Sequence, residues 1–328
     1  MQFGIQLGNL DWQHLKDVAQ AAEALGFHSL MMPDHVLHEG PERHAHLDYL
    51  SYEAMVKAAV VIEATRTVEV GHLVLCNLFR HPVMTAQALM SLDTLSGGRT
   101  FIGIGTGWTE REFQMTGIPF PDIATRLPML DEALTIIRSL FTRDTTTFAG
   151  EFYRLRDAVL HPKPMRKPHP PILLGGGGRG LLRLAAKHAD AVNIINETGR
   201  PGFIAVAELT KFTDESYRGK VRFLREAAAR HGRDGHAIRM SNAIFSTIIA
   251  DTPAAARDAA EGLARFFRLP PEGMRHAPTA LIGTPEECAA ELRRRSAAWE
   301  LDQVVFAFSD ERTMQRLAED VLPLLRET

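Results

Sequence analysis

The regular alternation of short apolar runs with helix-patterned segments is the feature that most restricts how this chain can fold. About eight such pairs follow one another along the 328 residues, and the apolar runs are rich in Val, Ile and Leu. Such runs are typical of parallel strands that are buried on both faces. Eight strand–helix units favour an α/β fold closed into a (β/α)8 TIM barrel over an open doubly wound sheet. We expect one domain that spans residues 1–328.

Short apolar runs predict the strands, and apolar residues three and four positions apart predict the helices. The expected strands are 3–7, 29–32, 69–76, 100–105, 172–174, 191–195, 239–249 and 303–308. The expected helices are 12–25, 52–65, one that begins at Pro82, 128–141, 181–188, 217–231, 253–267, one that begins at Pro285, and 311–325. Loop insertions follow the second and fourth strands, and residues 145–155 predict a β-hairpin before the fifth strand.

Four consecutive glycines follow the fifth expected strand. Gly175, Gly176, Gly177 and Gly178 are followed by Arg179 and a helical pattern. Bare backbone amides at the start of a helix bind anions well, because no Cβ blocks approach and the helix dipole adds positive charge. Arg179 would add a fixed positive charge. The sequence therefore predicts a phosphate site here, and the alternative is a flexible turn between a strand and a helix.

Composition narrows the range of partners and compartments. A formal net charge of −3 gives no general attraction for nucleic acid or an anionic membrane. The amino terminus enters a strand pattern directly, and no run approaches the roughly eighteen apolar residues that span a membrane. Cys76 and Cys288 lie far apart and form no metal or redox motif. We expect a cytoplasmic protein that binds a small molecule, neither nucleic acid nor a membrane.

In a barrel of this kind the functional site lies where the strands end. The residues that follow the second to sixth expected strands are therefore the candidates. They are Asp34, His35, Cys76, Asn77, Thr106, Gly107, Trp108, Gly175, Gly176, Gly177, Gly178, Arg179 and residues 193–197. This set contains an anion cradle, an aromatic ring and a histidine, but no obvious pair of nucleophile and base.

Several of these motifs occur together in one known superfamily. Pro33-Asp34-His35, Arg80-His81-Pro82, the glycine-rich segment 103–108 and the segment 171–179 resemble the luciferase-like monooxygenase superfamily. Within it they are most similar to the coenzyme F420-dependent oxidoreductases, and the resemblance covers nearly the whole chain. It implies a (β/α)8 barrel that holds a deazaflavin across the carboxyl ends of its strands, and a homodimer.

The resemblance also implies roles for single residues. Gly175–Gly178 and Arg179 would hold the cofactor phosphate. Asp34 and His35 match a pair beside the deazaflavin ring. Cys76-Asn77 matches the place of a bulge with a non-proline cis peptide behind the ring. Thr106, Gly107 and Trp108 match the turn that lines the ring and the substrate.

His35 is the expected catalytic residue. The pKa of an unperturbed imidazole lies near neutrality, so His35 could exchange the proton that accompanies hydride transfer. The alternative is that His35 only caps the strand end through a hydrogen bond with Asp34. Some sugar-phosphate dehydrogenases of this branch carry Trp where this chain has Glu39, and Glu where it has Trp108. Trp108 then either forms an apolar wall for a hydrophobic substrate or packs beneath the insertion.

The sequence thus predicts an oxidoreductase that transfers a hydride between coenzyme F420 and a small, hydrophobic or unsaturated substrate. Two rivals stay open. One is an FMN-dependent monooxygenase on the same scaffold, and the other is a cofactor-binding protein without turnover. A metal-dependent barrel hydrolase is disfavoured, because His44-Ala45-His46 lies inside a polar loop and not at a strand end.

Overall fold

Nine parallel strand segments form a nearly closed barrel in the computed structural model, which describes residues 1–36, 52–196, 211–267, 274, 277–307 and 310–325. Their order in the sheet is β3-β2-β1-β13-β10-β9-β8-β5-β4. They are β1 (Gln2–Gln6), β2 (Ser29–Met32), β3 (Glu69–His72), β4 (Leu75–Cys76), β5 (Ile102–Gly105), β8 (Ile172–Gly175), β9 (Ala191–Asn193), β10 (Arg239–Ile244) and β13 (Leu301–Ala307). A bridge between Val70 and Thr100 brings β3 beside β5 and closes the ring. The expected TIM barrel is confirmed.

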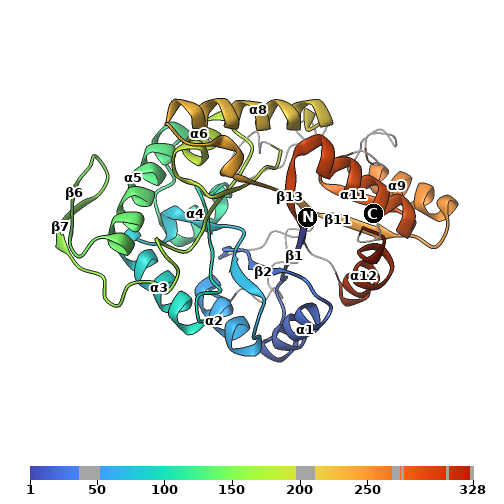
Figure 1. The fold of residues 1–328 in the computed structure, drawn as a ribbon, viewed down its shortest axis with the longest axis horizontal. Helices are drawn as coiled ribbons and strands as arrows, with labels where there is room; N and C mark the ends of the chain where they lie inside the picture. Colours follow the sequence, from blue (N-terminus) through green and yellow to red (C-terminus); the bar gives the residue numbers. More distant parts are fainter. Residues whose placement is uncertain (37–51, 197–210, 268–273, 275–276, 308–309, 326–328) are drawn as a thin grey trace.

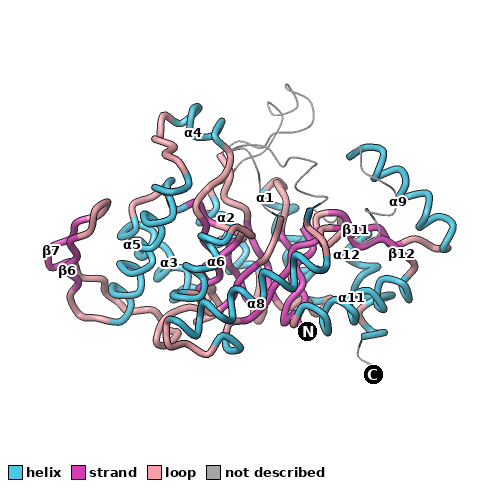
Figure 2. Tube along the Cα trace, turned by 90° about the horizontal axis from the view of Figure 1, so that it is seen from above, coloured by secondary structure: helices cyan, strands magenta, loops and turns pink. Residues whose placement is uncertain are grey.

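Most of the helices surround the strands on the outside of the barrel (Figure 1). The helices are α1 (Trp12–Ala24), α2 (Ala54–Ala64), α3 (Pro82–Leu95), α4 (Glu110–Thr116), α5 (Ile123–Thr142), α6 (Arg179–His188), α8 (Asp214–Arg230), α9 (Pro253–Phe267), α11 (Pro285–Trp299) and α12 (Glu311–Arg316). By contrast, α4 lies beyond the carboxyl ends of the strands, and α9 lies beside β11 (Ser246–Ile249) and β12 (Ala280–Gly283) (Figure 2). Short-range signals set many of the starts. Thr284 and Glu287, for example, form the capping box that opens α11 after the sequence Thr-Pro-Glu-Glu.

Two expected strands are interrupted. The segment 69–76 divides into β3 and β4, with a bend at Leu73 and Val74. The segment 239–249 divides into β10, inside the barrel, and β11 (Ser246–Ile249). The backbone N–H groups of Phe245 and Ser246 both donate to the carbonyl oxygen of Thr279, which turns the chain away from the barrel. There β11 pairs with β12 (Ala280–Gly283), a strand that the sequence pattern does not predict.

The expected helix 128–141 begins five residues earlier than expected, at Ile123. The side chain of Asp122 accepts a hydrogen bond from the Thr125 N–H at 2.8 Å and caps the helix, so Pro128 lies inside it. The expected helix 311–325 ends as α12 at Arg316, followed by a π turn (Leu317–Val321) and a 3₁₀ turn (Pro323–Leu325).

The predicted hairpin is present as β6 (Thr146–Ala149) and β7 (Arg154–Ala158), which are antiparallel. It projects from the edge of the molecule beside α5 (Figure 2). Among the described residues, no helix combines the length and the apolar character that crossing a membrane requires.

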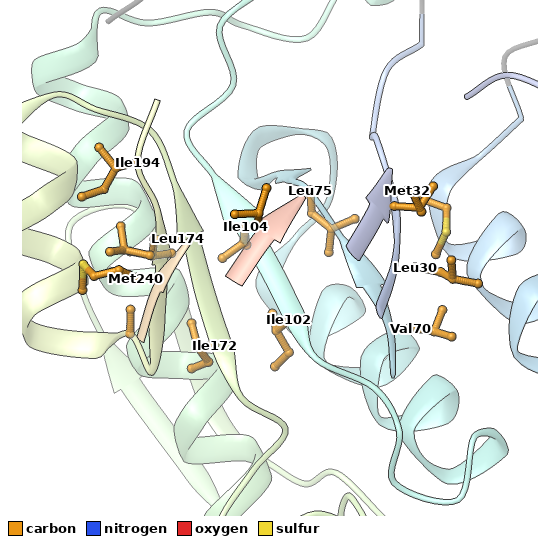
Figure 3. Packing of buried hydrophobic residues seen from close by; sticks show 14 of the residues in the cluster. Leu30, Met32, Val70, Leu75, Ile102, Ile104, Ile172, Leu174, Ile194 and Met240 are labelled. Carbon is orange, nitrogen blue, oxygen red and sulfur yellow. The ribbon is translucent and has the colours of Figure 1, made fainter. Parts of the chain in front are cut away.

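Alternate residues of each strand face two different apolar regions. One set packs against the helices, and Figure 3 shows ten of its labelled members around the barrel wall. The other set fills the barrel interior, and it contains Met31, Phe101, Leu173, Ala191 and Val305. The two faces explain why these strands appear in the sequence as continuous apolar runs. The carboxyl ends of the strands lie on the side of α4, opposite the amino terminus (Figure 2).

Candidate active site

The carboxyl ends of β2, β4, β5 and β8 meet at the mouth of the barrel. The Asp34 carboxylate accepts a hydrogen bond from the Cys76 N–H at 2.9 Å, which joins the end of β2 to the end of β4. A Cβ placed on Gly105 or on Gly175 would lie 2.9 or 2.8 Å from a methyl carbon of Val74. The structure therefore brings most of the predicted site residues to one place.

Asp34 forms a nearly buried ion pair. Two nitrogens of the Arg80 guanidinium, Nη1 and Nη2, donate to its carboxylate at 2.7 and 2.9 Å. Arg80 also pairs with Glu53. Burial lowers the pKa of Arg80, but hydrogen bonds to Asp34 and Glu53 outweigh it and raise the pKa above its usual value. Asp34 thus holds β2, β4 and the start of α3 together, and its contact with a cofactor stays a prediction.

His35 pairs with an acid that the sequence analysis missed. Its Nδ1 lies 3.1 Å from Oε2 of Glu112, and the N–H of Val36 donates to Oε1 of the same carboxylate at 2.7 Å. Trp108 approaches the imidazole edge-on, with ring centroids 5.8 Å apart and planes at 88°. The alternative role considered for His35 was a hydrogen bond with Asp34, but the Asp34 carboxylate accepts hydrogen bonds from Arg80 and the Cys76 N–H.

Glu112 could not be found from the sequence pattern. It lies in Glu-Arg-Glu, a triplet that is typical of a solvated helix surface. In the structure α4 turns this carboxylate inward beside Phe113, and the residue is only 2% exposed. The one local signal is that Phe113, an apolar neighbour, marks a buried side of the short helix.

Cys76 and Asn77 are both buried at the end of β4. Burial raises the pKa of the Cys76 thiol to about 12, so the group stays protonated at neutral pH. The expected position of the non-proline cis peptide is wrong. It lies between Leu73 and Val74, because the strand bends before β4 and not after it.

The turn after β5 packs against Cys76 and is held by a hydrogen bond from Arg126. Gly107 has a φ of +77°, and a Cβ there would lie 2.7 Å from Sγ of Cys76. The Arg126 guanidinium donates to the Gly107 carbonyl oxygen at 2.8 Å. Thr106 and Gly107 are partly exposed, and Trp108 is 36% exposed. An exposed indole beside His35 favours the apolar wall that the sequence analysis considered for Trp108.

The four glycines connect β8 to α6, as expected. Gly176 has a φ of +146°, which L side chains rarely adopt. A Cβ on Gly177 would lie 2.0 Å from the carbonyl oxygen of Ile195, so packing against the end of β9 demands glycine there. A Cβ on Gly178, by contrast, would meet no atom within 4 Å. The protein's own packing and backbone conformation explain the first three of these glycines, but they leave open space beside the fourth, Gly178.

Two cations border this loop. The Arg179 guanidinium lies 5.1 Å from the ring centroid of Phe223 on α8. From the same helix, the ammonium of Lys220 donates to the Gly177 carbonyl oxygen at 2.5 Å. Arg179 follows the glycines directly and is predicted from the sequence, whereas Lys220 lies more than forty residues away and is not. The space beside Gly178 and this positive charge suit an anionic group such as a phosphate.

Some candidates lie outside the described residues. These are the loop residues Glu39, His44 and His46, and Glu197 after β9. Asn193, at the end of β9, is buried and donates to the Ser241 hydroxyl at 2.8 Å.

This arrangement agrees with the comparison to known families. Residues 2–302 match the model of the family described as luciferase-like monooxygenase, so the chain belongs to that family. Residues from both sides of the mouth lie within the match.

Particular relatives are named for coenzyme F420. An F420-dependent glucose-6-phosphate dehydrogenase of Amycolatopsis mediterranei is 27% identical over 95% of this chain and 94% of its own length. A protein with the same description from Intrasporangium calvum is 34% identical over 57% of this chain and 55% of its own length.

A solved structure has the same fold. The F420-dependent secondary alcohol dehydrogenase, solved in complex with an F420-acetone adduct, matches with a TM-score of 0.78. The match covers 99% of both chains at 21% sequence identity.

Proposed function

We propose that this protein is an F420-dependent oxidoreductase that acts on a small organic substrate of hydrophobic or unsaturated character. The open space beside Gly178, at the start of α6 and next to Arg179, is the observation that carries the proposal. The packing of the fold requires no glycine at that position, and a ligand that approaches the backbone closely would account for one. The F420 dependence named for the relatives supports the choice of cofactor.

The residues present fit a phosphate-bearing deazaflavin. Backbone amides at Gly178 and Arg179 would bind the phosphate, and Arg179 and Lys220 would balance its charge. Gly105 and Gly175 let the Val74 side chain pack closely between the ends of β5 and β8, and the planar ring would lie over this part of the mouth. The cofactor supplies the hydride chemistry at its ring. The protein's part is to orient the reactants and to move the accompanying proton.

His35 would exchange that proton with the substrate. It is partly exposed at the mouth, and Glu112 and Trp108 hold its ring from two sides. Trp108 would present an apolar surface to the substrate, which supports a hydrophobic substrate over a sugar phosphate. The predicted roles of Asp34, Cys76, Asn77 and Thr106 are to support the ring from the ends of β2, β4 and β5.

A titration of the purified protein with F420 and, separately, with FMN tests the cofactor. We expect micromolar binding of F420, followed by fluorescence, and turnover when candidate acceptors are added to the reduced complex. Preferential binding of FMN would favour the monooxygenase alternative. Tight F420 binding without turnover of any acceptor would favour a binding protein, and binding of neither cofactor would refute the proposal.

Replacement of Gly178 tests the phosphate site without disturbing the fold. Gly178→Ala should weaken F420 binding about tenfold, or roughly 1.4 kcal/mol, because the new methyl group enters the space of the phosphate. The free energy of unfolding without cofactor should stay unchanged, since the backbone there is extended and the space is open. Gly262→Ala on α9, which also meets open space, is the control for F420 affinity; because Gly262 lies inside a helix, this change should raise the unfolding free energy by about 1 kcal/mol. Unchanged F420 affinity in Gly178→Ala would refute this site.

The homodimer that the family resemblance implies stays a prediction. Sedimentation of the purified protein would test it.

A further inference from the structure

Glu112 grips two successive groups at the end of β2. One carboxylate oxygen accepts the Val36 N–H at 2.7 Å, and the other lies 3.1 Å from Nδ1 of His35. The Glu112 side chain is 3% exposed, while the His35 side chain is 23% exposed. The acid therefore lies behind the histidine, which reaches toward the barrel mouth.

This contact determines which nitrogen of the imidazole carries the proton. A carboxylate has only acceptor atoms, so Nδ1 must be the donor in the hydrogen bond to Glu112. In a neutral imidazole the proton on Nδ1 leaves Nε2 as the basic nitrogen. Trp108, edge-on at a centroid distance of 5.8 Å, restrains the same ring from a second direction.

We propose that Glu112 is a positioning residue that fixes the tautomer and the orientation of His35, so that proton exchange with the substrate passes through Nε2. The part that concerns proton exchange rests on the function proposed above, but the part that concerns the tautomer does not. In the step itself a bond from hydrogen to substrate oxygen or carbon breaks or forms, and a bond from hydrogen to Nε2 does the opposite. Glu112 touches neither the substrate nor the reacting atoms.

Two hydrogen bonds of the Glu112 carboxylate, to the Val36 N–H and to Nδ1 of His35, make Glu112→Gln a direct test. The Val36 N–H needs an acceptor, so the amide oxygen of a glutamine would face Val36 and its NH2 group would face His35. Nδ1 must then accept, and the proton moves to Nε2. The variant keeps the size of the side chain and the bond to Val36, but it reverses the tautomer.

The tautomer can be measured without cofactor or activity. Long-range ¹⁵N–¹H spectra of histidine-labelled protein distinguish the two ring nitrogens, and His35→Asn identifies the signals of His35. We expect the Nδ1–H form in the wild-type protein and the Nε2–H form in Glu112→Gln. An Nε2–H form in the wild type, or the same tautomer in both proteins, would overturn the proposal. If Glu112→Gln fails to fold, the wild-type spectrum still decides whether His35 has the Nδ1–H form that the proposal requires.

Single-turnover kinetics test the consequence for catalysis. Glu112→Gln should slow hydride transfer about 100-fold while F420 affinity stays unchanged. The double variant Glu112→Gln, His35→Asn should transfer hydride only slightly more slowly than His35→Asn alone, since the two residues act as a unit. Glu110→Gln is the matched control, because Glu110 is exposed on the same helix and its carboxylate faces Gln114.

The two failures can be told apart. A wild-type protein that binds no F420 refutes the proposed function and leaves the tautomer result standing. A normal F420 affinity with an unchanged transfer rate in Glu112→Gln refutes the positioning role alone.

Discussion

The two sides of the barrel mouth are built in different ways. At the ends of β2, β4 and β5, side chains make the structure, through the Asp34–Arg80 pair and the His35–Glu112 pair. At the end of β8 the backbone makes it, through Gly176, Gly177 and Gly178. The side at β2, β4 and β5 positions side chains that carry charge or exchange protons. The side at β8 leaves open space beside the backbone. We infer that the first side controls chemistry and that the second controls cofactor binding.

Replacement of His35 should have the largest effect and bear directly on this division. His35→Asn should slow hydride transfer about 100- to 10,000-fold, because the accompanying proton loses its acceptor or donor. F420 affinity should not change, since the residue lies on the other side of the mouth from Gly178. Stopped-flow absorbance of the cofactor measures the rate. A rate equal to that of the wild type would assign His35 a structural role only.

Replacement of Asp34 should affect stability more than binding. Asp34→Asn leaves Arg80 as a partly buried cation with a weakened partner, which should cost about 3 kcal/mol of unfolding free energy. Urea denaturation measures the loss. Asp17→Asn on the exposed side of α1 is the control. A loss below about 1 kcal/mol would mean that solvent already weakens this pair.

The glycine side should separate folding from binding at adjacent residues. Gly177→Ala should cost about 2 kcal/mol of unfolding free energy, because its methyl group would overlap the Ile195 carbonyl oxygen. Gly178→Ala should cost none and should act only on F420 affinity. Urea denaturation and fluorescence titration of both variants distinguish the two effects. Equal losses of stability would contradict the division between these two positions.

Glu69, at the amino end of β3, provides a reference far from the mouth. Burial raises the pKa of this carboxyl group, but His28 and Arg166 outweigh it and hold the pKa at about 2. Because the pKa is lowered on folding, the stabilisation is complete above the ordinary value of 4.5 and is lost as the pH falls toward 2.

After allowance for screening by solvent, Glu69→Gln should lower the free energy of unfolding by about 1 kcal/mol at pH 7. Its unfolding free energy should also vary less between pH 4.5 and 2 than that of the wild type. Denaturation curves over this range measure both effects, and F420 affinity at pH 7 should not change. A loss of affinity would show that the two ends of the barrel are coupled.

The sequence predicted the elements whose signals are local. The strand 29–32 and the helix 253–267 match β2 and α9 to the residue, since apolar spacing and flanking turns mark both. The glycine turn between β8 and α6 was predicted because four glycines in a row are unusual at any position, and its phosphate site stays a prediction.

What the sequence missed depends on partners that are distant along the chain. Glu112 reaches His35 across 77 positions, and Lys220 reaches Gly177 across 43. The strand β12 is four residues long and is recognised as a strand only by its pairing with β11. Periodicity carries no information about such contacts, because it describes one segment at a time.

The barrel closes where β3 lies beside β5, and this closure requires a glycine at position 103. A Cβ there would lie 1.6 Å from the His72 carbonyl oxygen, so any other residue would wedge the wall apart. Cys76 and its bond to Asp34 lie just beyond this seam, at the end of the same interrupted strand. A larger residue at Gly103 would therefore change the shape of the barrel mouth without replacing any residue that lines it.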